Sequence, residues 1–203
     1  MKTRFLIGLI LFALTAAWLG GSAVADEVAV LDIRIGKEKK LSRVIIEFYG
    51  DAAPATVENF KKLVREKFYN GTAFHRVFPG QLVQGGDPLS RSEDRTNIGT
   101  GGPGYTLPAE INRHRHLAGS VAMARLGDKV NPARVSNGSQ FYISLVPMPD
   151  LDGKYTVFGN VIAGHEVLDL ISRKATDTND NPVERIVIRR ARIADRSVAA
   201  SLE

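Results

Sequence analysis

Short apolar segments, most of them bounded by glycine or proline, constrain the fold of this chain more than any other feature. They are rich in β-branched and aromatic residues and too short for buried helices, so they predict strands. They lie at residues 31–35, 44–48, 72–77, 82–86, 120–124, 140–145, 156–161 and 185–193. Two other segments, one starting at Pro54 and one around residues 167–171, space their apolar residues by three and four and predict helices. This pattern favours a mainly β fold, one closed antiparallel barrel, over a βαβ fold.

The composition describes one ordinary globular domain with restricted chemistry. The 203 residues are 44% hydrophobic and include no cysteine, which excludes disulfides, thiolate metal sites and a cysteine nucleophile. The formal net charge is only +5, and Lys2 and Arg4 supply two of those charges. A cluster of arginines near the end of the chain is therefore interpreted as a solvated strand face: Arg189, Arg190, Arg192 and Arg196. We expect no nucleic-acid partner.

The N-terminus has the pattern of a secretory signal peptide. Lys2 and Arg4 precede an apolar run from Phe5 to Leu19, and Ala23-Val24-Ala25 provides small residues for cleavage. The run is shorter than the roughly 20 residues that span a bilayer, although an uncleaved anchor is the alternative interpretation. We expect a signal peptide at 1–25, a functional domain at 26–196 and a polar tail at 197–203. The protein would be exported, to the bacterial periplasm or, alternatively, secreted, with no stable membrane association after cleavage.

Two possible cofactor or metal motifs do not have the context that such sites require. The glycine-rich run at 99–104 matches the spacing of a dinucleotide fingerprint, but Pro103 lies where a helix should begin and no βαβ unit surrounds it. His114 and His116 have no third ligand nearby in the sequence, so we interpret them as part of a solvated polar loop. We expect neither a metal nor a cofactor.

Five longer motifs occur in an order that resembles the cyclophilin family of peptidyl-prolyl isomerases. They are Phe74-His75-Arg76-Val77-Phe78-Pro79-Gly80, Leu82-Val83-Gln84-Gly85-Gly86-Asp87, Ser120-Val121-Ala122-Met123-Ala124-Arg125, Asn137-Gly138-Ser139-Gln140-Phe141-Tyr142-Ile143 and Leu151-Asp152-Gly153-Lys154-Tyr155-Thr156-Val157-Phe158-Gly159. The resemblance extends from about Val28 to Ile193. It implies a closed eight-stranded antiparallel barrel capped by two helices, and the substrates it implies are proline-containing, unfolded or flexible polypeptides. We expect a monomer that accelerates X–Pro isomerisation while exported proteins fold.

The resemblance assigns the central chemical role to Arg76. Rotation about an X–Pro bond breaks amide resonance, at a barrier of about 18–20 kcal/mol, and needs no nucleophile, metal or cofactor. In the twisted state the prolyl nitrogen regains its lone pair, which a fixed cationic donor stabilises. Because an arginine keeps its charge, Arg76 suits that task.

Other positions acquire substrate-binding roles through the same resemblance. Gln84 would hydrogen-bond the peptide backbone, and Leu82, Tyr142 and Leu151 would form the wall of the proline pocket. The main chain at Ala124 and Arg125 would bind the peptide, and His75 would have a supporting role at most. The full set of expected substrate contacts is His75, Gln81, Leu82, Gln84, Ala124, Arg125, Gln140, Tyr142, Leu151 and Tyr155. Phe74 and Phe141 are expected to face the barrel interior.

Some positions depart from the pattern of the family. Gln81 stands where a phenylalanine usually lines the pocket, Tyr142 replaces another phenylalanine, and Tyr155 replaces a frequent histidine. A polar Gln81 would weaken the contact with proline, so a proline-peptide binding protein or holdase with little turnover is the alternative function. The loops at 88–98 and 126–136 are longer than in short members, and Lys129 or Arg134 could steer acidic peptides there.

Overall fold

The computed structural model describes residues 26–200. The expected signal peptide at 1–25 therefore lies outside the described residues, as do residues 201–203. Within residues 26–200, no helix has the length and apolar character needed to cross a bilayer.

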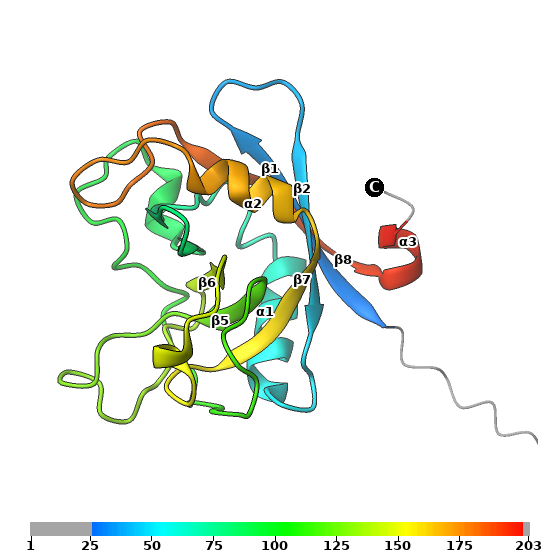
Figure 1. Ribbon diagram of the computed structural model, residues 1–203, viewed down its shortest axis with the longest axis vertical. Helices are drawn as coiled ribbons and strands as arrows, with labels where there is room; N and C mark the ends of the chain where they lie inside the picture. The colour runs from blue at the N-terminus through cyan, green and yellow to red at the C-terminus, as the bar shows by residue number, and fades with distance from the viewer. Residues whose placement is uncertain (1–25, 201–203) are drawn as a thin grey trace, which may run out of the picture.

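Eight antiparallel strands form one curled sheet in the order β3-β4-β6-β5-β7-β2-β1-β8. The strands are β1 (Glu27–Ile35), β2 (Ser42–Phe48), β3 (Arg76–Phe78), β4 (Leu82–Gly85), β5 (Ser120–Met123), β6 (Phe141–Ser144), β7 (Val157–Ala163) and β8 (Ile186–Asp195). The helices are α1 (Pro54–Arg65), α2 (His165–Ser172) and α3 (Arg196–Ala200), with 3-10 turns at Pro88–Arg91 and Pro149–Leu151. The long connections on either side of β5 gather on the side of the molecule away from α3 (Figure 1).

The expected closed barrel is wrong, because the sheet forms a half-barrel whose end strands β3 and β8 are not joined by a ladder. The chain turns at Gly71, where φ is +83°, and β3 then spans only three residues. The two edges are linked instead by three main-chain hydrogen bonds: Gly71 N–H to Ile188 O, Ile188 N–H to Thr72 O, and Phe74 N–H to Ile186 O, at 2.8–2.9 Å. A short strand preceded by a turn cannot provide the pairing that closure requires.

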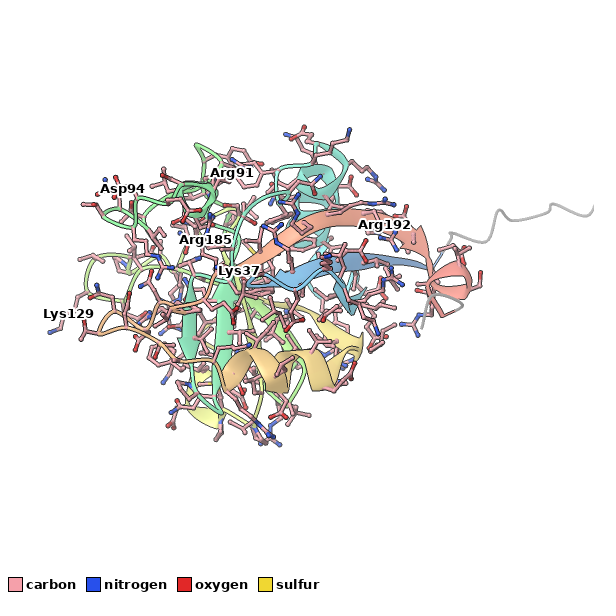
Figure 2. The ribbon with its side chains drawn as sticks, turned by 90° about the horizontal axis from the view of Figure 1, so that it is seen from above. Lys37, Arg91, Asp94, Lys129, Arg185 and Arg192 are labelled. Atoms are coloured by element: carbon pink, nitrogen blue, oxygen red, sulfur yellow. The ribbon has the colours of Figure 1, made fainter. Side chains whose placement is uncertain are left out.

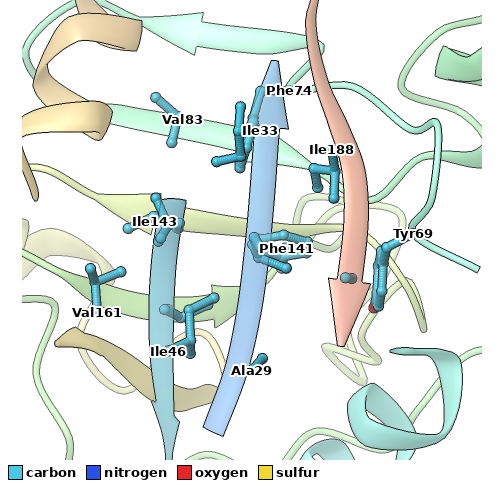
Figure 3. Close-up of a cluster of buried hydrophobic side chains, with 14 of the residues drawn as sticks. Ala29, Ile33, Ile46, Tyr69, Phe74, Val83, Phe141, Ile143, Val161 and Ile188 are labelled. Carbon is cyan, nitrogen blue, oxygen red and sulfur yellow. The ribbon is translucent and has the colours of Figure 1, made fainter. Parts of the chain in front are cut away.

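The core lies inside the curl of the sheet and is dominated by aromatic rings. Phe141 of β6 packs edge-on against Phe60 of α1 at 5.4 Å, against Tyr69 at 5.7 Å and against Phe74 at 6.2 Å between ring centroids. Strands β1, β4 and β8 add aliphatic side chains around these rings (Figure 3). The interior positions expected for Phe74 and Phe141 are therefore confirmed.

Helix α1 closes one side of the core, and its first turn is fixed from a distant part of the chain. Pro54 begins the helix as expected, and Val57 and Phe60 lie on its buried face. The N-cap, Ala53, has no capping side chain, but the Glu110 carboxylate accepts hydrogen bonds from the N–H groups of residues 55 and 56 at 3.0 and 2.8 Å. A carboxylate at a helix N-terminus also complements the helix dipole. This contact ties the long β4–β5 connection to the core.

The C-terminal segment does not begin as the expected polar tail. Residues 196–200 form α3, and Ala199 is buried against Val28 and Val30 on the outer face of β1. The nearby arginines are ion-paired: Arg192 contacts Asp32, and Arg196 contacts Asp26 and Glu47. Arg189 and Arg190 of the same cluster are exposed.

Candidate active site

A groove of about 580 Å³ runs along the outer face of β3, β4 and β6. Every sequence-predicted site residue except His75 lines it. Those residues are Arg76, Gln81, Leu82, Gln84, Ala124, Arg125, Gln140, Tyr142, Leu151 and Tyr155. Residues far apart in the sequence therefore meet in one hollow.

The register of the sheet explains why these side chains share a face. Arg76 pairs with Gln84 across β3 and β4, and Gln84 pairs with Tyr142 across β4 and β6. Directly opposed residues in an antiparallel sheet project to the same side, so these three side chains form one row. The next row, which includes Val83 and Ile143, is buried on the core side. Alternation thus separates the groove from the core residue by residue.

Arg76 lies at one end of this row, with its side chain 47% exposed. Its guanidinium carbon lies 4.4 Å from the centre of the Phe78 ring, and its Nε donates to the Asp180 carboxylate at 3.4 Å. The guanidinium is therefore held at the rim of the groove between an aromatic face and an acid. Neither terminal nitrogen has a hydrogen-bond or ion-pair partner among residues 26–200, so both can meet a substrate.

Two glutamines next to Arg76 form a fixed amide pair. Gln84 Nε2 donates to Gln140 Oε1 at 2.9 Å, while Gln140 Nε2 donates to the carbonyls of Gly99 and Gly101 at 2.9 and 2.8 Å. Because Gln140 is buried and its amide is engaged on both sides, it orients Gln84. No described residue donates to Gln84 Oε1, so this oxygen can accept a hydrogen bond from a peptide N–H.

An apolar hollow occupies the middle of the groove. Tyr142 is buried at its floor, with Leu82, Leu151 and Tyr155 packed around it. The Tyr142 and Tyr155 rings meet edge-to-face at 5.7 Å. Gln81 is exposed beside Leu82 at the rim, in the turn between β3 and β4. Apart from Gln81, these walls suit a compact apolar ring such as that of proline.

Sequence reasoning missed a hydrogen-bonded chain beneath this hollow. His116 Nε2 lies 2.8 Å from the Tyr142 hydroxyl, and His116 Nδ1 lies 3.0 Å from the Asp152 carboxylate. The expected solvated position of His116 is wrong, because this residue is only 1% exposed, and His114 stacks on the Tyr49 ring. These hydrogen bonds hold the Tyr142 ring in place and give its buried hydroxyl a partner.

The surroundings of these hydrogen-bonded side chains also shift the pKa values of Tyr142 and Asp152. Burial raises the pKa of Tyr142 well above its usual range, so its hydroxyl stays protonated. The backbone N–H of His116 donates to Asp152 and lowers the pKa of that carboxyl.

The segment at Ala124 and Arg125 has a more restricted role than the resemblance implies. Both main-chain polar groups of Ala124 already have partners inside the protein. Its N–H donates to Gln140 O, and its carbonyl accepts from the Asn137 N–H, each at 2.9 Å. The side chain of Arg125 is 3% exposed; it pairs with Asp128 at 2.7 Å and covers the Tyr155 ring. In this segment, the main chain of Arg125 is therefore the part that can pair with a peptide.

The longer loop at 126–136 extends the groove with apolar side chains that sequence reasoning did not single out. Leu126 and Val130 line the groove and are highly exposed. Of the two cations expected to steer peptides, Arg134 is paired with Asp128 at 3.1 Å, whereas Lys129 points outward at the edge of the molecule (Figure 2). Runs of one or two apolar residues in a loop carry no periodic signal, so only the fold identifies them.

His75 is not part of the groove, contrary to its expected place among the substrate contacts. It is buried behind Arg76 and borders two neighbouring hollows. The reason is alternation: Arg76 points into the groove, so the residue before it points away from it. Burial lowers the pKa of His75 below its ordinary value of 6.5, against the opposing influence of the Asp87 charge.

This lowered pKa predicts an acid-sensitive fold. As pH falls through about 6.5, the unfolded chain binds a proton at His75 that the folded chain resists, so the free energy of unfolding should fall. Above that pH the contribution is fully present. Urea unfolding of wild-type protein and His75→Asn at pH 7.5, 6.5 and 5.5 measures the effect. The wild type should lose more stability than the variant on acidification, and parallel losses would contradict the prediction.

Within residues 26–200, no three metal-ligating side chains gather into a possible metal site. Of the sequence-predicted set, the structure thus brings together ten residues around a peptide-sized groove and places one behind it.

Comparisons with known proteins point to one family. The profile described as "Cyclophilin type peptidyl-prolyl cis-trans isomerase/CLD" matches residues 30–193. The chain is 37% identical over 154 residues to "Peptidyl-prolyl cis-trans isomerase ppi1" of Schizosaccharomyces pombe, covering 76% of this chain and 94% of that one. It is 46% identical over 127 residues to "Peptidyl-prolyl cis-trans isomerase B" of Bacillus subtilis, covering 62% and 80%.

A solved structure shares the fold. The crystal structure of a cyclophilin-type isomerase from Cryptosporidium parvum superposes with a TM-score of 0.71 at 28% identity, covering 83% of this chain and 97% of that one. A second structure of that protein, determined in the presence of the dipeptide Ala-Pro, gives a TM-score of 0.70 at 28% identity, covering 82% and 98%.

Proposed function

Because the chain belongs to the cyclophilin-type family of peptidyl-prolyl cis-trans isomerases, we propose that it uses the groove to isomerise X–Pro bonds in exported polypeptides as they fold. The observation that carries the proposal is the cross-strand row of Arg76, Gln84 and Tyr142. This row sets a cation, a backbone hydrogen-bonding group and an apolar pocket side by side. A reaction that twists a peptide around a proline needs these three elements together.

The proposed mechanism relies on geometry and charge alone. The hollow of Leu82, Tyr142 and Leu151 holds the proline ring, and Gln84 Oε1 accepts a hydrogen bond from the peptide backbone. The Arg76 guanidinium then lies beside the prolyl nitrogen. As the C–N bond twists, the nitrogen lone pair localises and the cation stabilises it more strongly than it stabilises either planar isomer. Each 1.36 kcal/mol of such differential stabilisation gives about a tenfold rate increase.

An exchange measurement on a short peptide tests the proposed site. NMR exchange spectroscopy of an Ala-Pro peptide reports cis–trans interconversion directly, with and without catalytic amounts of protein. We expect fast exchange with the wild type, and exchange close to the uncatalysed rate with a variant that lacks Arg76. Fast exchange with that variant would place the chemistry elsewhere.

The proposed place of action is the bacterial periplasm, with secretion as the alternative. The basic start, apolar run and Ala23-Val24-Ala25 motif support export. Expression of the full chain in a bacterium, followed by fractionation and N-terminal sequencing, tests the proposal. A periplasmic protein that begins at Asp26 is the expected result. A full-length protein retained in the membrane fraction would support an uncleaved anchor instead.

Gln81 favours the second candidate function, a proline-peptide binding protein with little turnover. An exposed amide at the rim replaces the apolar ring expected there and provides less apolar contact with proline. Such a protein would bind the peptide and slow its release without accelerating exchange.

Replacement of Gln81 by phenylalanine should therefore raise kcat/KM on an Ala-Pro peptide by roughly three- to tenfold, because the ring adds apolar contact at the rim. Gln81→Ala is the matched control, since it removes the amide without adding a ring, and it should change kcat/KM little. A protease-coupled assay of isomerisation measures both variants. Equal values for the two variants would show that this rim position does not limit turnover.

A further inference from the structure

The side chain of Arg76 has one polar partner among residues 26–200, the carboxylate of Asp180. An arginine on a three-residue edge strand has many accessible rotamers, and its side chain is half exposed. The Phe78 ring supports one face of the guanidinium, but a ring face does not select one in-plane orientation. A hydrogen bond donated by the Nε–H does select one, because the guanidinium is planar and its five N–H donors have fixed directions.

Asp180 is held beside Arg76 by main-chain bonds and not by the ion pair itself. The carbonyl of Asp180 accepts a hydrogen bond from the Val77 N–H at 2.9 Å, so the loop is joined to β3 at the residue after Arg76. Within the loop, the Asp180 N–H donates to Asp177 O, and the Asp177 carboxylate accepts from the N–H groups of Asn179 and Asn181. The position of the acid is therefore fixed before its side chain meets the guanidinium.

The acid lies on the side of Arg76 away from the proline hollow. Asp180 borders a second, polar hollow that shares Arg76, Gln84 and Gly99 with the groove, and Asp180 does not line the groove itself. By engaging Nε from behind, it leaves the two terminal nitrogens of Arg76 free to face the substrate. A half-exposed ion pair at 3.4 Å adds little to the stability of the fold. What the pair can do is orient the Arg76 guanidinium.

We propose that Asp180 is a positioning residue for the isomerase reaction, which holds the Arg76 guanidinium in the orientation that meets the prolyl nitrogen. This inference rests on the proposed role of Arg76. Asp180 does not touch the substrate. It should affect kcat more than KM, because the proline hollow and Gln84 are unchanged while the cation matters most in the twisted state.

The backbone at Asp180 determines which variants are informative. Its φ is +62°, a left-handed conformation that asparagine and glycine also adopt readily. Asp180→Gly removes the carboxylate without straining the loop. Asp180→Asn keeps an oxygen that can accept the Arg76 Nε–H bond but removes the charge. Thr178→Ala, at an exposed position in the same loop, is the matched control.

NMR exchange at several Ala-Pro peptide concentrations separates kcat from KM for these variants. We expect Asp180→Gly to lose about ten- to a hundredfold in kcat with KM within about twofold, Asp180→Asn to recover most of the loss, and Thr178→Ala to match wild type. Wild-type kcat in Asp180→Gly, a loss confined to KM, or equal losses in the glycine and asparagine variants would each overturn the proposal. If Arg76→Ala itself retains activity, the assignment of Arg76 fails, whereas activity in Asp180→Gly alone removes only the positioning role.

Discussion

Arg76→Ala should lower kcat/KM on an Ala-Pro peptide by about 10²- to 10³-fold, the range typical for removing one transition-state donor. The loss should fall mainly on kcat, because the proline hollow and the glutamine pair remain. The side chain is half exposed and its pair with Asp180 is weak, so the free energy of unfolding should change by less than about 1 kcal/mol. A protease-coupled assay and urea unfolding on the same preparations measure both quantities.

Two variants make this test specific. Arg76→Lys keeps a positive charge but loses the planar group, and should retain an intermediate activity. Arg173→Ala removes an exposed arginine at the C-cap of α2, where it pairs with Asp169 four residues away, and should leave kcat/KM unchanged. Wild-type kinetics in Arg76→Ala would remove the central assignment, and a comparable loss in Arg173→Ala would point to a general effect of charge.

Phe141→Ala should lower the free energy of unfolding by about 3–5 kcal/mol, a large share of the 5–15 kcal/mol typical of a domain. Phe141 is fully buried, and its ring contacts Phe60, Tyr69 and Phe74. Phe60 belongs to α1, and Tyr69 and Phe74 to the α1–β3 connection; all three rings are buried and packed, so we expect them not to close the cavity left by the missing ring. The shift in the urea midpoint at constant m-value measures the loss.

Phe78→Ala is the matched control for this prediction, because it makes the same substitution on the groove side of β3, where the ring is partly exposed. It should cost about 1–2 kcal/mol in stability. It should also lower activity, because the Phe78 ring supports the Arg76 guanidinium. Equal destabilisation by the two variants would contradict the division of this sheet into a core face and a groove face.

Much of the fold could be predicted from the sequence because its signals are local. The apolar spacing after Pro54 predicts α1, and β-branched runs predict strands that the structure contains within a few residues of the expected bounds. Alternation predicts that Phe141 faces the core, and Tyr142 faces the groove. Closure of the barrel could not be predicted in this way, because it depends on whether two distant edges, β3 and β8, find enough extended chain to pair.

The candidate site also combines features that local sequence signals predict with features that depend on contacts between distant segments. Its motifs identify ten groove residues by resemblance, and the strand register then explains why Arg76, Gln84 and Tyr142 form one row. The sequence pattern misplaced His75, since adjacent strand residues face opposite sides, and it gave no indication that His116 is buried against Tyr142. The apolar residues of the 126–136 loop also carried no signal.

By itself, the sequence determined which residue types are available and which face of each strand they occupy, because both follow from neighbours along the chain. Only the tertiary structure decided that Asp180, more than 100 positions away from Arg76, is the acid that engages its guanidinium. The physical reason is that a side chain is oriented by whatever the fold brings within hydrogen-bonding distance. In this protein, a main-chain bond from β3 to a distant loop sets that distance.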